Sequence, residues 1–229
     1  MKNISLSRSS FDFLKDLSKN NNREWFNKNK ERYIREYGNM IAFASALLQE
    51  MKKHDTIETT SGKDALFRIY RDTRFSKDKT PYKTCWAGSF KRATKKLRGG
   101  YYFQIEPGGS LAAGGFFSPS PADLLRIRQD MDWNYTDWKK LLSGKIMANT
   151  FGELKGETVI TAPKGFSKDN HAIELLRHKQ FYFERKFSDK EVLSNDFLKE
   201  LNQTFRNLRP WFDYMSEVLT TDLNGVSVI

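Results

Sequence analysis

The sequence predicts an α+β fold in which helices pack on a largely antiparallel sheet. Apolar residues recur every three or four positions near the N-terminus, alternate with period two after residue 62, and return to helical spacing after residue 121. The turn sequence EPGG within the alternating region leaves no room for the crossover helix that a parallel sheet requires. We therefore expect a single domain over residues 1–229, with N-terminal helices at about 9–54, the sheet at about 64–117, and C-terminal helices with one strand at about 121–220.

The N-terminal region predicts a short helix followed by a longer one. Ser9 or Ser10 can cap the short helix, and the run NNN at residues 20–22 offers a stop and a fresh cap. Apolar side chains then step by three and four from Trp25 to Met51, as one buried helical face requires. Because this spacing already explains the aromatic residues, we interpret them as core and not as a ligand-binding cage.

Four stretches with period-two alternation follow and predict an antiparallel meander. The EPGG sequence joins the last two, since proline suits the first central position of a turn and glycine suits the positive φ of the second. The four expected strands cover residues 67–71, 86–90, 102–105 and 111–114.

The C-terminal part returns to helical spacing and contains one further strand. We expect helices at residues 122–131 and 137–147, a helix that begins at Asp169, and a final helical region at residues 189–219. The stretch FYFERKF at residues 181–187 alternates and predicts the fifth strand.

A loop of twelve residues, 73–84, joins the first two expected strands, whereas hairpin loops usually take about two to five. Loops of this length in compact domains tend to be either functional or disordered. We expect an ordered loop, with Phe75 and Tyr82 in the core and with Asp72 or Asp78 paired to arginine or lysine.

Positive charge is concentrated around this loop. The chain has a net charge of +11, and residues 63–99 contain twelve Lys or Arg against three Asp. The resulting positive potential attracts phosphates, nucleic acid or anionic surfaces. We therefore expect a phosphate-bearing ligand or nucleic acid as the partner.

Several classes of protein and site are excluded. No apolar run reaches the roughly 18 residues of a membrane span, and the N-terminus lacks the apolar block of a signal peptide, so we expect a cytoplasmic protein with no membrane partner. The single cysteine, Cys85, permits no internal disulfide, and the three histidines give no spacing typical of zinc. We expect no metal and no other cofactor. The oligomeric state stays open.

Basic residues in and near the long loop form the first candidate site. Arginine can grip phosphate oxygens with two parallel N–H groups, and lysine supplies a mobile positive charge. The structural alternative is that Asp72 and Asp78 only pair with neighbouring cations to fix the loop, which leaves the excess of positive charge unexplained. The predicted anion-binding residues are Arg68, Arg71, Arg74, Lys79, Lys83 and Arg177.

An enzyme that acts on a small anionic substrate is the alternative function, and whether the protein is an enzyme stays open. Alternation places Arg68, Tyr70 and Asp72 on one face of the first strand, where Tyr102, Gln104 and Glu106 would join them in a polar pocket. The alternative is a sheet face that simply meets solvent. The candidate catalytic residues for proton transfer are Asp72 and Glu106.

Long motifs resemble one known family. The motifs are RIYRDTRFSKDKTPYKT, YYFQIEPGGSLAAGGFFSP, KGFSKDNHAIELLRHKQFYFERKFSD and, before them, NNREWFNKNK. They resemble the domain-of-unknown-function 2461 family, a set of uncharacterised proteins, and the resemblance covers roughly residues 9–219. It implies a single domain but no activity and no catalytic residues.

Overall fold

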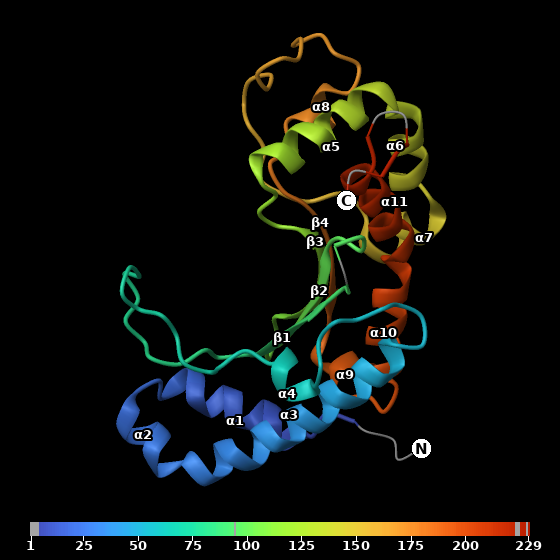
Figure 1. Cartoon of the computed structure of the whole chain (residues 1–229). Coiled ribbons are helices and arrows are strands. Elements are labelled where there is room, and N and C mark those ends of the chain that lie inside the picture. Colours follow the sequence, from blue (N-terminus) through green and yellow to red (C-terminus); the bar gives the residue numbers. More distant parts are fainter. Residues whose placement is uncertain (1–4, 94, 223–224, 228) are drawn as a thin grey trace. The chain divides into compact units, whose positions relative to one another are not determined.

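The computed structural model describes residues 5–93, 95–222, 225–227 and 229. This part of the chain consists of helices and one four-stranded antiparallel sheet, which confirms the predicted α+β class (Figure 1). Within it, no helix is long and apolar enough to span a lipid bilayer.

Close packing divides the chain into two compact units, each assembled from three segments. Unit 1 contains Met1–Phe90, Tyr102–Ala112 and Lys186–Gln203, and unit 2 contains Lys91–Tyr101, Ala113–Arg185 and Thr204–Ile229. The chain passes from one unit to the other within each strand of the sheet. The expected single domain stays a prediction, which one cooperative unfolding transition would support and two separate transitions would contradict.

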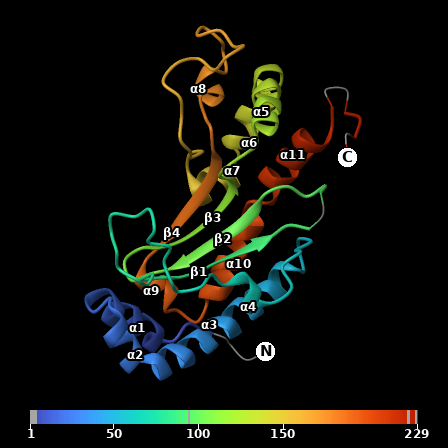
Figure 2. The same ribbon diagram turned by 60° about the vertical axis from the view of Figure 1, so that its left-hand side comes forward.

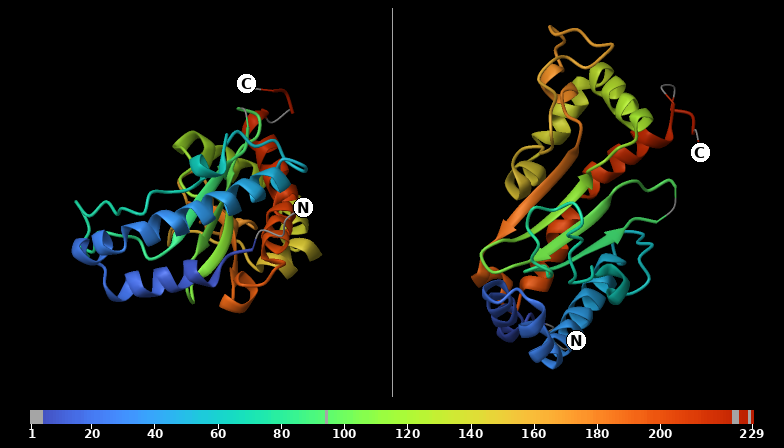
Figure 3. Two further views of the ribbon diagram at one scale, coloured as in Figure 1. Left: turned by 90° about the horizontal axis from the view of Figure 1, so that it is seen from below. Right: turned by 90° about the vertical axis from the view of Figure 1, so that its left-hand side faces the viewer.

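Unit 1 begins with three helices where the sequence predicts two: α1 (Arg8–Lys19), α2 (Arg23–Lys28) and α3 (Lys30–Met51). The longer predicted helix is interrupted at Asn29, which ends α2 and precedes α3. Helices α1 and α3 pack side by side (Figure 3). Both helices bury large apolar residues, among them Phe13 on α1 and Phe43 on α3. A packed helical pair therefore forms the base of unit 1.

Hydroxyl groups at the start of α1 fix it to α3. The predicted cap at Ser9 or Ser10 is wrong, because Ser7 is the cap and accepts a hydrogen bond from the backbone N–H of Ser10. The Ser9 and Ser10 hydroxyls instead donate to the buried Glu36 carboxylate of α3 at 3.1 and 2.7 Å. The predicted fresh cap in the NNN run is confirmed, since Asn22 caps α2.

The sheet has the strand order β1-β2-β3-β4 (Figure 2). The strands are β1 (Trp86–Lys91), β2 (Gly100–Ile105), β3 (Ser110–Phe116) and β4 (Phe181–Phe187), so four of the five predicted strands are confirmed. The EPGG turn is also confirmed. The Gly109 N–H donates to the Glu106 carbonyl at 2.9 Å, and Gly108 has the positive φ of 74° that this turn requires.

The predicted strand at residues 67–71 is wrong. This segment is extended but forms only isolated bridges, Leu66 to Gly88 and Tyr70 to Tyr82. Between the two bridges, the returning segment contains two more residues than the outgoing one. That mismatch shifts the register and prevents a continuous ladder of hydrogen bonds.

The remaining helices differ from the predictions mainly at their ends. The predicted helix 137–147 is divided in two before Lys145, and the helix expected from Asp169 begins at Ile173. A one-turn helix after Ser61 was not predicted. These helices are α4 (Gly62–Ala65), α5 (Pro121–Trp133), α6 (Tyr135–Leu142), α7 (Lys145–Phe151), α8 (Ile173–Leu176), α9 (Asp189–Val192), α10 (Phe197–Asn207) and α11 (Arg209–Thr220).

Aromatic side chains dominate the core of unit 2. The ring of Trp211 on α11 lies 5.6 Å from the ring of Trp138 on α6 and 5.2 Å from the ring of Phe183 on β4. The buried Asp130 carboxylate accepts hydrogen bonds from Trp138 at 2.7 Å and from Tyr214 at 3.0 Å. Burial, followed by the charge of Asp130, raises the pKa of Tyr214, which keeps its hydroxyl protonated as a donor.

Candidate functional site

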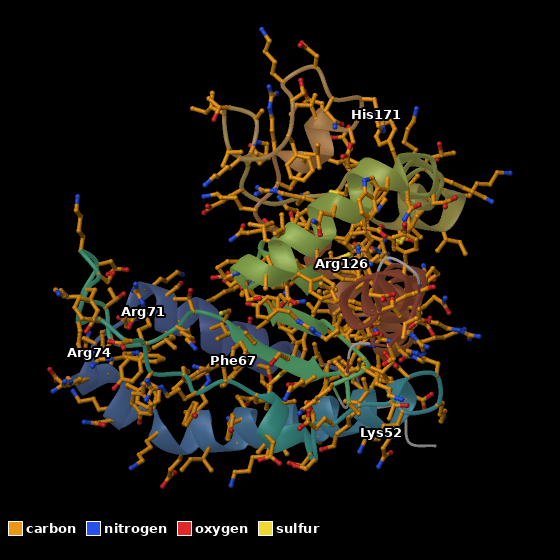
Figure 4. The ribbon with its side chains drawn as sticks, turned by 45° about the horizontal axis from the view of Figure 1, so that its top comes forward. Lys52, Phe67, Arg71, Arg74, Arg126 and His171 are labelled. Atoms are coloured by element: carbon orange, nitrogen blue, oxygen red, sulfur yellow. The ribbon has the colours of Figure 1, made fainter. Side chains whose placement is uncertain are left out.

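Residues 67–84 form a hairpin that we call the basic arm. Backbone hydrogen bonds join its two sides near the base: the Lys83 N–H donates to the Ile69 carbonyl at 2.8 Å, and the Arg71 N–H donates to the Pro81 carbonyl at 2.9 Å. Figure 4 shows Phe67 near the base of the arm, with Arg71 and Arg74 farther toward its tip. The arm is therefore an ordered hairpin, as predicted for the long loop.

Tyr82 anchors the base of the basic arm, as predicted. Its side chain is 4% exposed, and its ring stacks on Phe26 of α2 with the centroids 4.0 Å apart. The side chain of Asn21 forms two hydrogen bonds with the backbone of Tyr82. It donates to the Tyr82 carbonyl at 2.9 Å and accepts from the Tyr82 N–H at 3.1 Å. The base of the arm is thus held by packing and by hydrogen bonds.

The prediction that Phe75 lies in the core is wrong. Its side chain is 95% exposed at the tip of the basic arm. The Arg74 guanidinium, 5.7 Å from the ring centroid, is the cation that lies over it. An aromatic residue usually indicates burial, but the tip of the arm lies too far from the core of the protein for this ring to pack there.

Both aspartates of the basic arm are paired with arginine, as predicted. Asp78 accepts hydrogen bonds from the Arg71 guanidinium and from the backbone N–H of Thr80, at 2.9 Å for the latter. The Thr80 backbone bond, and then Arg71, lower the pKa of Asp78 to about 2. Arg74 donates twice to Asp72, at 3.0 and 2.6 Å, which lowers the pKa of Asp72.

These two ion pairs leave four cations of the basic arm without a carboxylate. The arm contains six Lys or Arg and two Asp, a net charge of +4. The Lys79 ammonium donates to the Thr73 carbonyl at 2.9 Å, and the Lys83 ammonium lies 5.4 Å from the centroid of the Phe67 ring. Arg68 and Lys77 are exposed. Among the described residues, none of these four cations has a carboxylate within ion-pair distance.

A chain of hydrogen bonds occupies the neighbouring polar residues of unit 1. The Tyr102 hydroxyl donates to Gln104 at 2.8 Å, and Gln104 donates in turn to the Glu106 carboxylate at 2.8 Å. The Thr84 hydroxyl donates to the other oxygen of Glu106 at 2.8 Å. The structure therefore connects the predicted Tyr102 and Gln104 of β2 with Glu106 just beyond its end, and adds Thr84, which the sequence did not single out.

Two titratable side chains near this network and in the arm, Cys85 and Asp72, have shifted pKa values. Burial, and then the charge of Glu106, raise the pKa of the Cys85 thiol to about 11, so the thiol is protonated at neutral pH. Asp72, the other candidate catalytic residue, is held ionised by Arg74, and its lowered pKa makes it a poor proton acceptor. Within the described chain, no group of three or more His, Cys, Asp or Glu side chains is placed to hold a metal ion.

Arg177, the sixth predicted anion-binding residue, belongs to unit 2. Its guanidinium donates to Glu174 at 3.0 Å, and it lines a cavity of about 910 Å³ together with His178, Tyr135 and Lys139. Burial lowers the pKa of His178, which leaves it neutral at pH 7. The participation of Arg177 in one surface with the basic arm stays a prediction.

The fold and the basic arm together define an α+β protein with an ordered, positively charged hairpin. A family model described as "Conserved hypothetical protein (DUF2461)" matches residues 9–214. The chain belongs to this family, which confirms the resemblance seen in the sequence motifs. No curated protein and no solved structure matches the chain.

Proposed function

We propose that the basic arm binds a phosphate-bearing ligand. The excess of cations over acids within the arm carries this proposal: after Asp72 and Asp78 have each taken an arginine, four cations still share one hairpin. Ion pairing inside the arm explains the two aspartates. It does not explain the cations that remain.

The energetics favour an anion on this surface. Like charges at 4 Å repel by about 1 kcal/mol in water, and by more where part of the solvent is excluded. Folding brings Arg68, Lys79 and Lys83 onto one hairpin and, within the described chain, places no carboxylate within ion-pair distance of them. A bound polyanion relieves this repulsion, and salt weakens the attraction because the cations are exposed.

The proposal uses the arm for binding and assigns it no reaction. Asp72 is engaged by Arg74, and both oxygens of Glu106 accept hydrogen bonds from neighbouring side chains. The enzyme alternative requires one of these carboxylates to take up a proton near neutral pH. Their contacts support a structural role instead.

The proposal is tested by comparing two double variants with the native chain. Arg68→Ala with Lys79→Ala removes two arm cations, while Lys52→Ala with Lys63→Ala removes the same charge from exposed positions outside the arm. Lys52 follows the end of α3, and Figure 4 shows it well away from Arg74. The probes are inorganic tripolyphosphate and a twelve-nucleotide thymidine oligomer, each at two salt concentrations.

We expect the arm variant to bind both probes about tenfold more weakly than the native chain, while the control variant stays within about twofold. For the oligomer, the slope of log affinity against log salt falls by roughly 1.4 when two phosphate contacts are lost. Negligible binding of both probes by the native chain, or equal weakening by both variants, would make the arm a structural hairpin and end the proposal.

A further inference from the structure

We propose that the ligand of the basic arm is single-stranded nucleic acid, and that the Phe75 ring stacks on one of its bases. This inference rests on the proposed function, because it names the class of phosphate-bearing ligand that the same arm binds. It arises from a feature that charge alone does not explain, namely a phenylalanine at the exposed tip of a hairpin.

Phe75 is far more exposed than the other large apolar residues of the basic arm. Ile69 and Tyr82 are buried, at 3% and 4% exposed, while Phe67 and Tyr70 are partly exposed, at 43% and 51%. Phe75 is 95% exposed, with Arg74 on one side and the polar residues Ser76 and Lys77 on the other. The ring therefore stabilises no packing within the described part of the chain, and the face that Arg74 does not cover is open to a ligand.

A second aromatic ring accompanies it. Tyr70 is 51% exposed, and its ring leans on Tyr82 at 5.5 Å and on Phe26 at 6.2 Å. These contacts hold one side of the Tyr70 ring and leave the rest accessible. Cations are interleaved with the two exposed rings: Arg68 precedes Tyr70, and Arg74 immediately precedes Phe75.

This alternation of ring and cation matches the chemistry of a single strand. Bases stack on aromatic side chains with little regard to sequence, because every base has a π face, while cations contact the phosphates between them. An arginine beside the ring adds a cation–π contribution to the same platform. Inorganic phosphate or a small phosphate ester without a base would bind the cations but would not contact the Phe75 ring.

Two other polyanions fit less well. In a duplex the base faces are already stacked, so a ring can reach them only by opening a base step, which costs free energy. An anionic membrane surface favours a broad apolar face that enters the lipid interface. The tip offers one ring surrounded by Arg74, Ser76 and Lys77, which is too little apolar surface for that mode.

The test separates bases from phosphates by using probes of equal charge. A twelve-nucleotide thymidine oligomer is compared with an abasic oligomer of the same number of phosphates, on the native chain and on Phe75→Ala, Phe75→Tyr and Ile34→Ala. Ile34 is an exposed apolar residue of α3 and serves as the control for removal of surface hydrophobicity. A duplex of the same length and vesicles of anionic phospholipid complete the panel.

We expect the native chain to bind the thymidine oligomer about tenfold more tightly than the abasic oligomer. Phe75→Ala should abolish this preference without changing the affinity for the abasic oligomer, whereas Phe75→Tyr and Ile34→Ala should keep it. Equal binding of the two oligomers by native chain and Phe75→Ala alike would overturn the stacking role and leave anion binding intact.

Three further outcomes would contradict the inference. Absence of binding to every probe would contradict the proposed function itself, and with it this inference. Tighter binding to the duplex than to the single strand, or vesicle binding that is lost in Phe75→Ala, would overturn the inference in favour of duplex or membrane recognition.

Discussion

Asp78 connects the tip of the basic arm to its outgoing side. Its carboxylate accepts from the Arg71 guanidinium, from the Thr80 backbone N–H and from the Thr80 hydroxyl. Each of these donors interacts more strongly with the ionised carboxylate than with the neutral acid. The charge of Asp78 therefore orders the turn that carries the exposed cations.

The order of the arm tip should consequently depend on pH in acid. Asp78 is exposed, and its hydrogen bonds set its pKa. The bond from the Thr80 backbone, followed by the bond from Arg71, lowers this pKa from its ordinary value of 3.8 to about 2. A carboxyl with a lowered pKa stabilises the folded form above the unfolded pKa, and this contribution is lost as the pH falls through the folded pKa. We expect the Thr80 amide resonance to shift with a midpoint near pH 2, and Asp78→Asn to remove that titration. A midpoint near pH 4 would contradict the pairing.

Some features of individual side chains could be predicted from the sequence, and others could not. Pairing of Asp72 and Asp78 with arginine follows from acids that lie within a few residues of several cations, so it was predictable. The exposure of Phe75 was not, because whether an aromatic residue is buried depends on what lies opposite it. The local sequence of residues 73–79 does not indicate that no other part of the described chain packs against the tip.

At the scale of the element, the basic arm is anchored at one end. Tyr82 stacks on Phe26 and is held by Asn21, whereas Phe75 lies at the exposed end. The stability that the arm adds to unit 1 therefore comes from its base. The proposal places the ligand at the tip.

This asymmetry predicts a contrast between two truncations in the same arm. Tyr82→Ala removes a buried stacked ring and should lower the free energy of unfolding by about 3 kcal/mol. Phe75→Ala removes an exposed ring and should change it by less than about 0.5 kcal/mol. Urea denaturation of the two variants measures both values, and similar losses would show that the tip is packed in solution.

The elements of the sheet were predictable where alternation and turn chemistry agree. Four strands and the EPGG turn follow from the period of the side chains and from the glycine that takes a positive φ. The expected strand at residues 67–71 has the same alternation but lacks a partner in constant register. Register is a property of two segments, so the pattern of one segment could not reveal the mismatch.

At the scale of the molecule, the concentration of charge is the feature that sequence and structure share. Residues 63–99 account for +9 of the net charge of +11. The structure gathers six of those cations on one ordered hairpin and pairs two of them internally. What the sequence alone could not show is how many cations the internal ion pairs leave without a carboxylate, since that depends on side-chain geometry.

The central claim is that the basic arm is the anion-binding surface of this protein, and a titration observed residue by residue tests it most directly. Backbone amide resonances of the full chain, labelled with ¹⁵N, are followed while inorganic tripolyphosphate is added at low salt. We expect the largest shifts in residues 67–84, and we expect them to reverse when salt is added. Shifts confined to the residues that line the cavity of Arg177, with the arm unchanged, or no shifts at all, would contradict the claim.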